Sequence, residues 1–189
     1  MRSTMLKRFG ITAAVLMGFG LAAGATTSSA TMPQSDEELA KKVRHEIVMY
    51  PQYTLWDNID FRVNHGSVEL MGAVSQPYKK SALGKIVQHV PGVTSVTNRL
   101  EVLPLSPLDD RLRVQVARAI FRDPVLSRYA IQTVPPIHII VDNGHVTLEG
   151  VVNSQMEKDV AGIRAASAGL SFGPVINNLR VENPPARKG

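Results

Sequence analysis

Three arginines recur along the helix that the sequence predicts over Leu108 to Asp123. At 100° per residue they fall within about 40° of one another, with a valine and a phenylalanine just beside them. Guanidinium groups next to apolar side chains suit anionic lipid headgroups and the acyl boundary beneath them. The alternative is that the two apolar side chains pack against a neighbouring domain and the arginines are merely solvated. The residues of this candidate lipid-binding surface are Arg111, Val114, Arg118, Phe121 and Arg122.

A second group of basic and aromatic residues lies earlier in the chain. Three lysines give another predicted helix a basic character, with a tyrosine nearby, and the only tryptophan falls in a loop before a predicted strand. Tryptophan often marks interfaces, but it also covers the ends of small cores, and the sequence does not separate these two readings. These secondary surface candidates are Trp56, Tyr78, Lys79, Lys80 and Lys85.

The sequence contains no recognisable catalytic or metal-binding constellation. It lacks cysteine, a G-x-S-x-G elbow, an H-E-x-x-H pair and a phosphate-binding glycine loop. The five histidines do not converge, and His138 and His145 are expected to face acids across a solvated hairpin. We therefore expect a protein that is not an enzyme and needs no cofactor or metal.

The elements that must position these residues occur twice. VNHGSVELMGAV begins at Val63, and VDNGHVTLEGVV begins at Val141, 78 positions later. The likeness extends in both directions, to VTNRLEV and VINNLRV on the C-terminal side. A repeat of this length is long enough for each copy to close its own core, so the sequence predicts two tandem domains.

Each copy is predicted to be a small α+β domain with the order helix, hairpin, helix, strand (αββαβ). Its three-stranded sheet would be packed by two helices. We define the first module as residues 35–103 and the second module as residues 108–183, joined by a linker over 104–107 and followed by a frayed tail over 184–189. The predicted helices are an opening one from Ser35 that stops by Pro51, then 76–90, 108–123 and 154–168, and the closing strands are 96–103 and 175–182.

Alternating apolar residues fix the expected register of both hairpins. In the first, Val63 should face Val68 around a His-Gly turn, and in the second, Val141 should face Val146 around Asn143-Gly144. Five glycines are assigned to the fold: two to these turns, one to a turn before a closing strand, and two to places where a side chain would obstruct the following helix. They are Gly66, Gly72, Gly92, Gly144 and Gly150.

Residues 1–30 have the order of a secretory signal peptide. Basic residues precede an apolar run from Ile11 to Ala23, and small residues follow, with cleavage expected after Ala30 or else Ala25. An uncleaved anchor is the alternative, although the run falls short of the ~20 residues of a spanning helix. The chain has a formal net charge of +5. Three of its basic residues and none of its acidic residues lie in this segment, so the rest of the chain has a net charge of +2. This small charge does not favour nucleic acid as a partner, and we expect an exported, periplasmic protein.

The repeated pattern resembles the BON domain of bacterial envelope proteins. The first copy carries HGSVELMGAV and GVTSVTNRLEV, and the second carries NGHVTLEGVV and GPVINNLRV. The resemblance implies a non-enzymatic periplasmic protein that associates with phospholipid surfaces or envelope proteins, often under osmotic or envelope stress.

The second copy departs from this pattern. It has extra residues around Tyr129 to Ile137, and the glycine before its last strand is displaced in AGLSFGPV. These departures put in doubt whether both copies bind the same ligand. Two functions follow from the sequence: peripheral binding of anionic phospholipid, or, alternatively, a chaperone or adaptor function toward polypeptide clients.

Overall fold

The computed structural model describes residues 35–169 and 171–182. The predicted signal peptide and C-terminal tail lie outside the described residues. Among the described residues, no helix is both long and apolar enough to cross a membrane.

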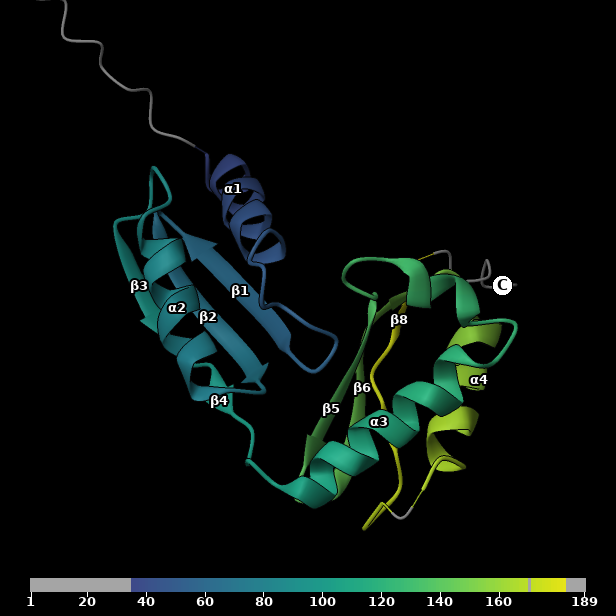
Figure 1. The fold of residues 1–189 in the computed structure, drawn as a ribbon. Helices are drawn as coiled ribbons and strands as arrows, with labels where there is room; N and C mark the ends of the chain where they lie inside the picture. Colours follow the sequence, from purple (N-terminus) through teal and green to yellow (C-terminus); the bar gives the residue numbers. More distant parts are fainter. Residues whose placement is uncertain (1–34, 170, 183–189) are drawn as a thin grey trace, which may run out of the picture. The chain divides into compact units, whose positions relative to one another are not determined.

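The first module is an α+β unit in which two helices pack against one small mixed sheet (Figure 1). Strand β2 lies in the middle, with β1 antiparallel on one side and β3 and β4 parallel to it on the other. Its elements are α1 (Asp36–Val48), β1 (Asn58–Asn64), β2 (Ser67–Val74), α2 (Pro77–Gln88), β3 (Ser95–Asn98) and β4 (Glu101–Val102).

The second module repeats this order and adds one short 3-10 helix, η1, where the sequence has its extra residues. Its elements are α3 (Pro107–Phe121), η1 (Ser127–Ile131), β5 (Ile137–Asp142), β6 (His145–Val152), α4 (Gln155–Ala166), β7 (Ile176–Asn177) and β8 (Arg180–Val181). Pro107 is the first residue of α3, so the predicted linker is one residue too long. Proline suits this position because the first helical N–H has no intrahelical partner.

Each module has its own hydrophobic core, with the predicted helix stripes at its centre. In α1, Leu39, Val43 and Ile47 are buried. In α3, the corresponding Leu112, Val116 and Ile120 are buried. Removing one such side chain costs about 2–5 kcal/mol, so these positions hold the helices on their sheets.

The hairpin registers are those that the sequence predicts. Val63 faces Val68 in the first module, and Val141 faces Val146 in the second. The turn residues His65 and Asn143 have φ values of 48° and 47°, each followed by a glycine of positive φ, as a tight two-residue turn requires.

An acidic residue at the start of the opening helix ties each helix to its hairpin turn. The Asp36 carboxylate accepts hydrogen bonds from the backbone N–H groups of His65 and Gly66, at 2.9 and 3.3 Å. In the second module, Asp109 accepts from the turn residues Asn143 and Gly144, at 3.1 and 2.9 Å. The same carboxylates also suit the positive end of a helix.

The closing strands are interrupted, whereas the sequence predicts continuous ones. In the first module, the Asn98 side chain donates to the carbonyl of Lys80 in α2 (2.7 Å) and accepts from the N–H of Leu100 (3.2 Å). Asn177 makes the equivalent bonds to Lys158 and Leu179 in the second module. Each asparagine thus links the closing strand to a helix and interrupts that strand, between β3 and β4 in the first module and between β7 and β8 in the second.

The glycines within β2 and β6 are required for a different reason from the predicted one. Gly72 and Gly150 have φ values of +103° and +115°. A Cβ at either position would collide with a backbone carbonyl oxygen of the facing segment, that of Asn58 or that of Pro136. The neighbouring strand, and not the following helix, therefore excludes a side chain there.

Candidate lipid-binding surface

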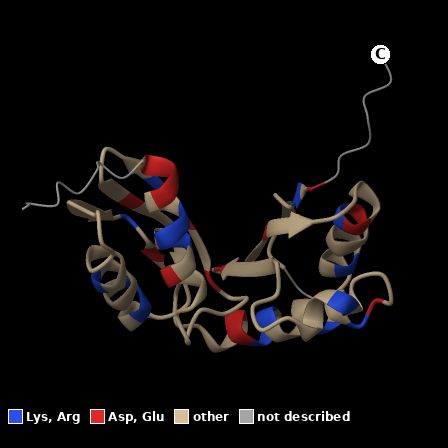
Figure 2. Ribbon diagram, turned by 90° about the horizontal axis from the view of Figure 1, so that it is seen from above, with Lys and Arg blue, Asp and Glu red and all other residues tan. Residues whose placement is uncertain are grey.

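Arg111 and Arg118 lie exposed on α3 and Arg122 caps its C-terminal end, all three on the face away from the buried stripe. Figure 2 shows basic residues in blue on the helices of both modules. No side-chain hydrogen bond or ion pair joins the guanidinium group of Arg111, Arg118 or Arg122 to another residue within the described part of the chain. Their guanidinium groups are therefore open to an anionic partner. The Ser106 side chain caps the helix by accepting a hydrogen bond from the N–H of Asp109 (3.3 Å).

The remaining arginine of α3, Arg113, has a structural role. Arg113 is buried and donates to the Val141 carbonyl oxygen (2.8 Å) and to the Asp110 carboxylate (2.5 Å). These bonds fix α3 to strand β5. Arg113 falls on the core side of the helix, so the helical wheel already separates it from the exposed row.

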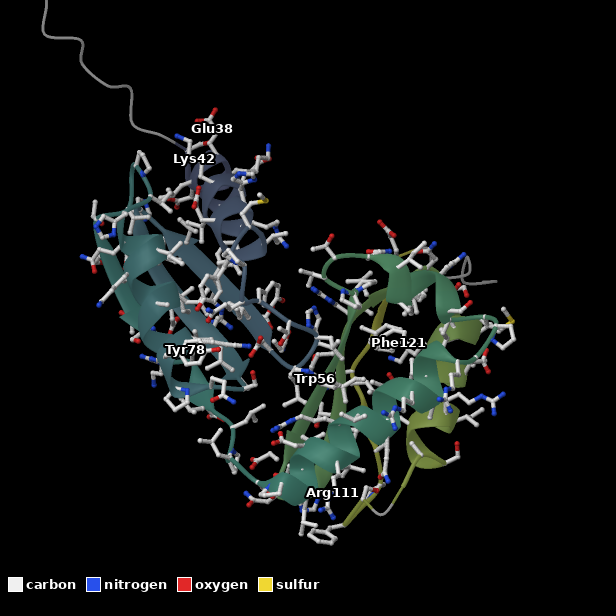
Figure 3. All side chains as sticks on the ribbon, in the orientation of Figure 1. Glu38, Lys42, Trp56, Tyr78, Arg111 and Phe121 are labelled. Carbon is white, nitrogen blue, oxygen red and sulfur yellow. The ribbon has the colours of Figure 1, made fainter. Side chains whose placement is uncertain are left out.

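The apolar part of the predicted surface divides in two. Val114 is exposed, whereas Phe121 is partly buried and packs against the core of its own module. Sequence reasoning missed Leu108, which is 65% exposed near the N-terminal end of α3. Figure 3 shows Arg111 and Phe121 near opposite ends of this helix. Exposed apolar side chains therefore accompany the arginine row at Leu108 and Val114.

Lys79 is not a surface residue, and this secondary candidate is wrong. Its side chain is buried and its Nζ donates to the Asp57 carboxylate (2.6 Å) and the Ser75 hydroxyl (2.9 Å). Lys79 continues the four-residue spacing of Leu83 and Val87, the buried stripe of α2. That spacing is the signal by which the sequence could have placed it inside.

Asp57 is the fully buried partner in this network. Burial raises the pKa of its carboxyl, but hydrogen bonds from Lys79, Ser75 and Thr54 outweigh that effect and hold the pKa below its ordinary value. The Asp57 carboxylate is thus fully hydrogen-bonded inside the module and forms a salt bridge with Lys79. It stabilises the loop before β1 against α2 and leaves no group for a ligand.

The other secondary candidates differ in exposure. Tyr78 and Lys85 are exposed, and Lys80 is half-buried. Trp56 is half-buried and packs, with Leu55, against the hydrophobic cluster of the second module. Its contact is therefore with the protein's own apolar side chains.

The histidines form no metal site in the described residues, where no group of three or more potential ligands is present. His138 does face Glu149 as predicted, and His145 faces Asp142. The expectation that both are solvated is wrong for His138, which is buried and stacks on Tyr53 with ring centroids 5.4 Å apart. Its burial lowers the pKa of the imidazole.

Comparison with known families identifies both halves. The BON domain matches residues 35–104 and again 109–183. The chain belongs to the BON family. BON domains bind phospholipids and occur in envelope-stress proteins, and the family is generally non-catalytic. The described fold, two tandem α+β units, agrees with a dual-BON protein.

Other comparisons add little. A search of curated proteins found no match. Similar solved structures include CdsD, a structural protein of the type III secretion system of Chlamydia trachomatis, with 17% identity, coverage of 77% of this chain and 61% of that chain, and a TM-score of 0.30. The C-terminal domain of CdsD gives 16% identity, 79% and 67% coverage and a TM-score of 0.30. The chain thus spans less than two thirds of the first of these proteins.

The arginine row belongs to the second BON module alone. Aligning the buried stripes of α1 and α3 places Glu38, His45 and Met49 where the second module has its three arginines. Glu38 carries the opposite charge to Arg111, and both residues are labelled in Figure 3. The two copies thus share a core and differ on the outer face of their opening helix.

Proposed function

We propose that this BON protein binds anionic phospholipid surfaces peripherally, through the outer face of α3. The observation that supports the proposal is the row of Arg111, Arg118 and Arg122, exposed on one helix face without an ionic partner in the described structure. Exposed apolar residues at Leu108 and Val114 lie on the same helix and would reach the acyl boundary.

The attachment is weak and sensitive to salt. Each basic group near an anionic surface contributes about 1 kcal/mol, so three arginines give reversible binding without stable anchoring. Screening shortens the range of this attraction to about 10 Å at 0.1 M salt and about 3 Å at 1 M. Weak, salt-dependent binding would let the protein dissociate from the membrane and bind again as the ionic strength changes.

We further propose that the protein works in the periplasm and helps to maintain the envelope under osmotic or other stress. The signal-like order of residues 1–30 and the occurrence of BON domains in envelope-stress proteins support this part of the proposal. The protein would act by binding, without catalysis.

Vesicle sedimentation tests the lipid surface directly. With vesicles containing phosphatidylglycerol, Arg118→Glu/Arg122→Glu should bind at least about 30-fold more weakly than wild type, because removing two arginines alone costs about 2 kcal/mol. The matched control is Lys80→Glu/Lys85→Glu on α2, which changes net charge equally and should bind nearly as wild type.

Unchanged sedimentation of the α3 double variant, or equal losses in both variants, would reject this surface. Suppression of client aggregation by a protein that does not sediment with vesicles would instead favour the alternative, a polypeptide-binding chaperone or adaptor.

A further inference from the structure

A cavity of about 540 Å³ opens in the second module at the N-terminal end of α3. Its walls come from that helix, from the β5–β6 turn and from the segment after α4. The volume lies in the range of small-molecule sites, which extends from about 300 to 1,000 Å³. The cavity adjoins the arginine row, because Arg111 is one of its lining residues.

The lining is mostly apolar and partly exposed to solvent. Leu112 is buried, whereas Leu108 and Phe172 are 65% and 73% exposed. Phe172 is held in place by its backbone N–H, which donates to the Gly144 carbonyl oxygen (3.0 Å), and its ring lies directly over Gly144. Phe172 and Leu108 therefore form an exposed apolar surface, and covering it with an apolar ligand would be favourable.

The charge at the cavity favours an anionic ligand. Arg111 is exposed and has no ionic partner among the described residues. Asp109, the acid in the lining, is 3% exposed and its oxygens accept from two turn N–H groups. Asp110 is occupied by its ion pair with Arg113. Neither neighbouring acid forms an ion pair with Arg111, so its guanidinium group is available to an anionic headgroup.

The first module differs at the positions that shape this cavity. Ser35 stands in place of Leu108, Glu38 in place of Arg111, and Thr94 in place of Phe172. The Thr94 and Phe172 backbones are equivalent, because each donates its N–H to the carbonyl oxygen of the hairpin-turn glycine. The apolar and cationic residues at this end of the opening helix are thus found together in the second module and are both replaced in the first.

We propose that this cavity binds one acyl chain of an anionic amphiphile, with Arg111 at the headgroup and Leu108, Leu112 and Phe172 around the chain. This inference rests on the proposed function and deepens it: the second module would hold a single lipid molecule as well as attract a charged surface. Because this cavity is built once, from the second module, the proposed stoichiometry is 1:1.

The test is calorimetric titration of the full-length protein with lysophosphatidylglycerol below its critical micelle concentration. Wild type should bind saturably, one lipid per chain. Gly169→Leu should weaken this binding about tenfold or more, the effect of excluding two chain methylenes. A side chain at Gly169 would extend between Leu112 and the flexible end of Gln115, inside the cavity.

Three comparisons make the result specific. Pro91→Leu alters the corresponding position of the first module and should bind as wild type. Arg111→Gln should weaken binding of lysophosphatidylglycerol but not of zwitterionic lysophosphatidylcholine. Gly169→Leu should still sediment with anionic vesicles, because Arg118 and Arg122 remain.

If Gly169→Leu does not fold, Phe172→Ser, which removes an exposed ring, replaces it.

Failure of wild type to bind the monomeric lipid while it sediments with vesicles would overturn the cavity proposal and leave the surface proposal intact. Equal binding by the Gly169→Leu variant would also overturn it. Binding of a peptide with an aromatic C-terminal residue, lost in Gly169→Leu, in place of lysolipid would show that the occupant is a polypeptide.

Discussion

Lys79 and Glu157 occupy the same position of their modules, 78 residues apart, and carry opposite charges. Both are buried at the start of the second helix, and both bind a group from the loop before the hairpin. Lys79 pairs with Asp57, whereas Glu157 pairs with Arg128 and accepts from the Tyr129 hydroxyl (2.9 Å). Each module thus has a salt bridge at this point, with the basic residue on the helix in the first module and the acidic residue on the helix in the second.

Replacing Lys79 with methionine should destabilise the protein by about 3–5 kcal/mol, because it leaves the Asp57 carboxylate buried without a counter-charge. Urea unfolding of the full chain measures the change. The neighbouring Lys80→Met is the control and should lie within about 0.5 kcal/mol of wild type. A loss below about 1 kcal/mol in Lys79→Met would contradict the assigned role of the pair.

At the scale of elements, the periodic parts of the fold follow from the sequence. Four-residue apolar spacing located the helices to within a few residues, and the turn residues fixed both hairpin registers. The broken closing strands do not follow, because the break depends on Asn98 and Asn177 reaching a helix that is distant in sequence. The role of Gly72 and Gly150 was missed for another reason: the register gives the facing residue, but not how closely its backbone carbonyl approaches.

Gly150→Ala should destabilise the second module by about 1–3 kcal/mol, since alanine is strained at a φ of +115° and its Cβ would strike the Pro136 carbonyl. Thermal unfolding of the full chain reports the loss. In the control Gly173→Ala, the new methyl group meets only the exposed His145 side chain, so a change of a few tenths of a kcal/mol is expected. Equal stability of the two variants would refute the close approach.

At the scale of the whole molecule, duplication gave two similar cores with different outer surfaces. The sequence located the arginine row of α3, because a helical wheel needs only the helix. It did not reveal the adjoining cavity, whose walls come from three segments that only the folded chain brings together. The sequence did show that the second copy departs from the repeat in AGLSFGPV, the segment that contains the cavity residues Gly169 and Phe172. The proposed lipid binding accordingly lies in the second module.

That assignment is tested most directly by paramagnetic relaxation in nitrogen-15 spectra of the full-length protein. Anionic vesicles carrying a nitroxide-labelled headgroup should reduce amide intensities along α3, around Arg111, Arg118 and Arg122. Amides of α1, around Glu38, should keep theirs, because that helix face lacks the arginine row. Equal losses on both helices, or losses confined to α1, would contradict the account.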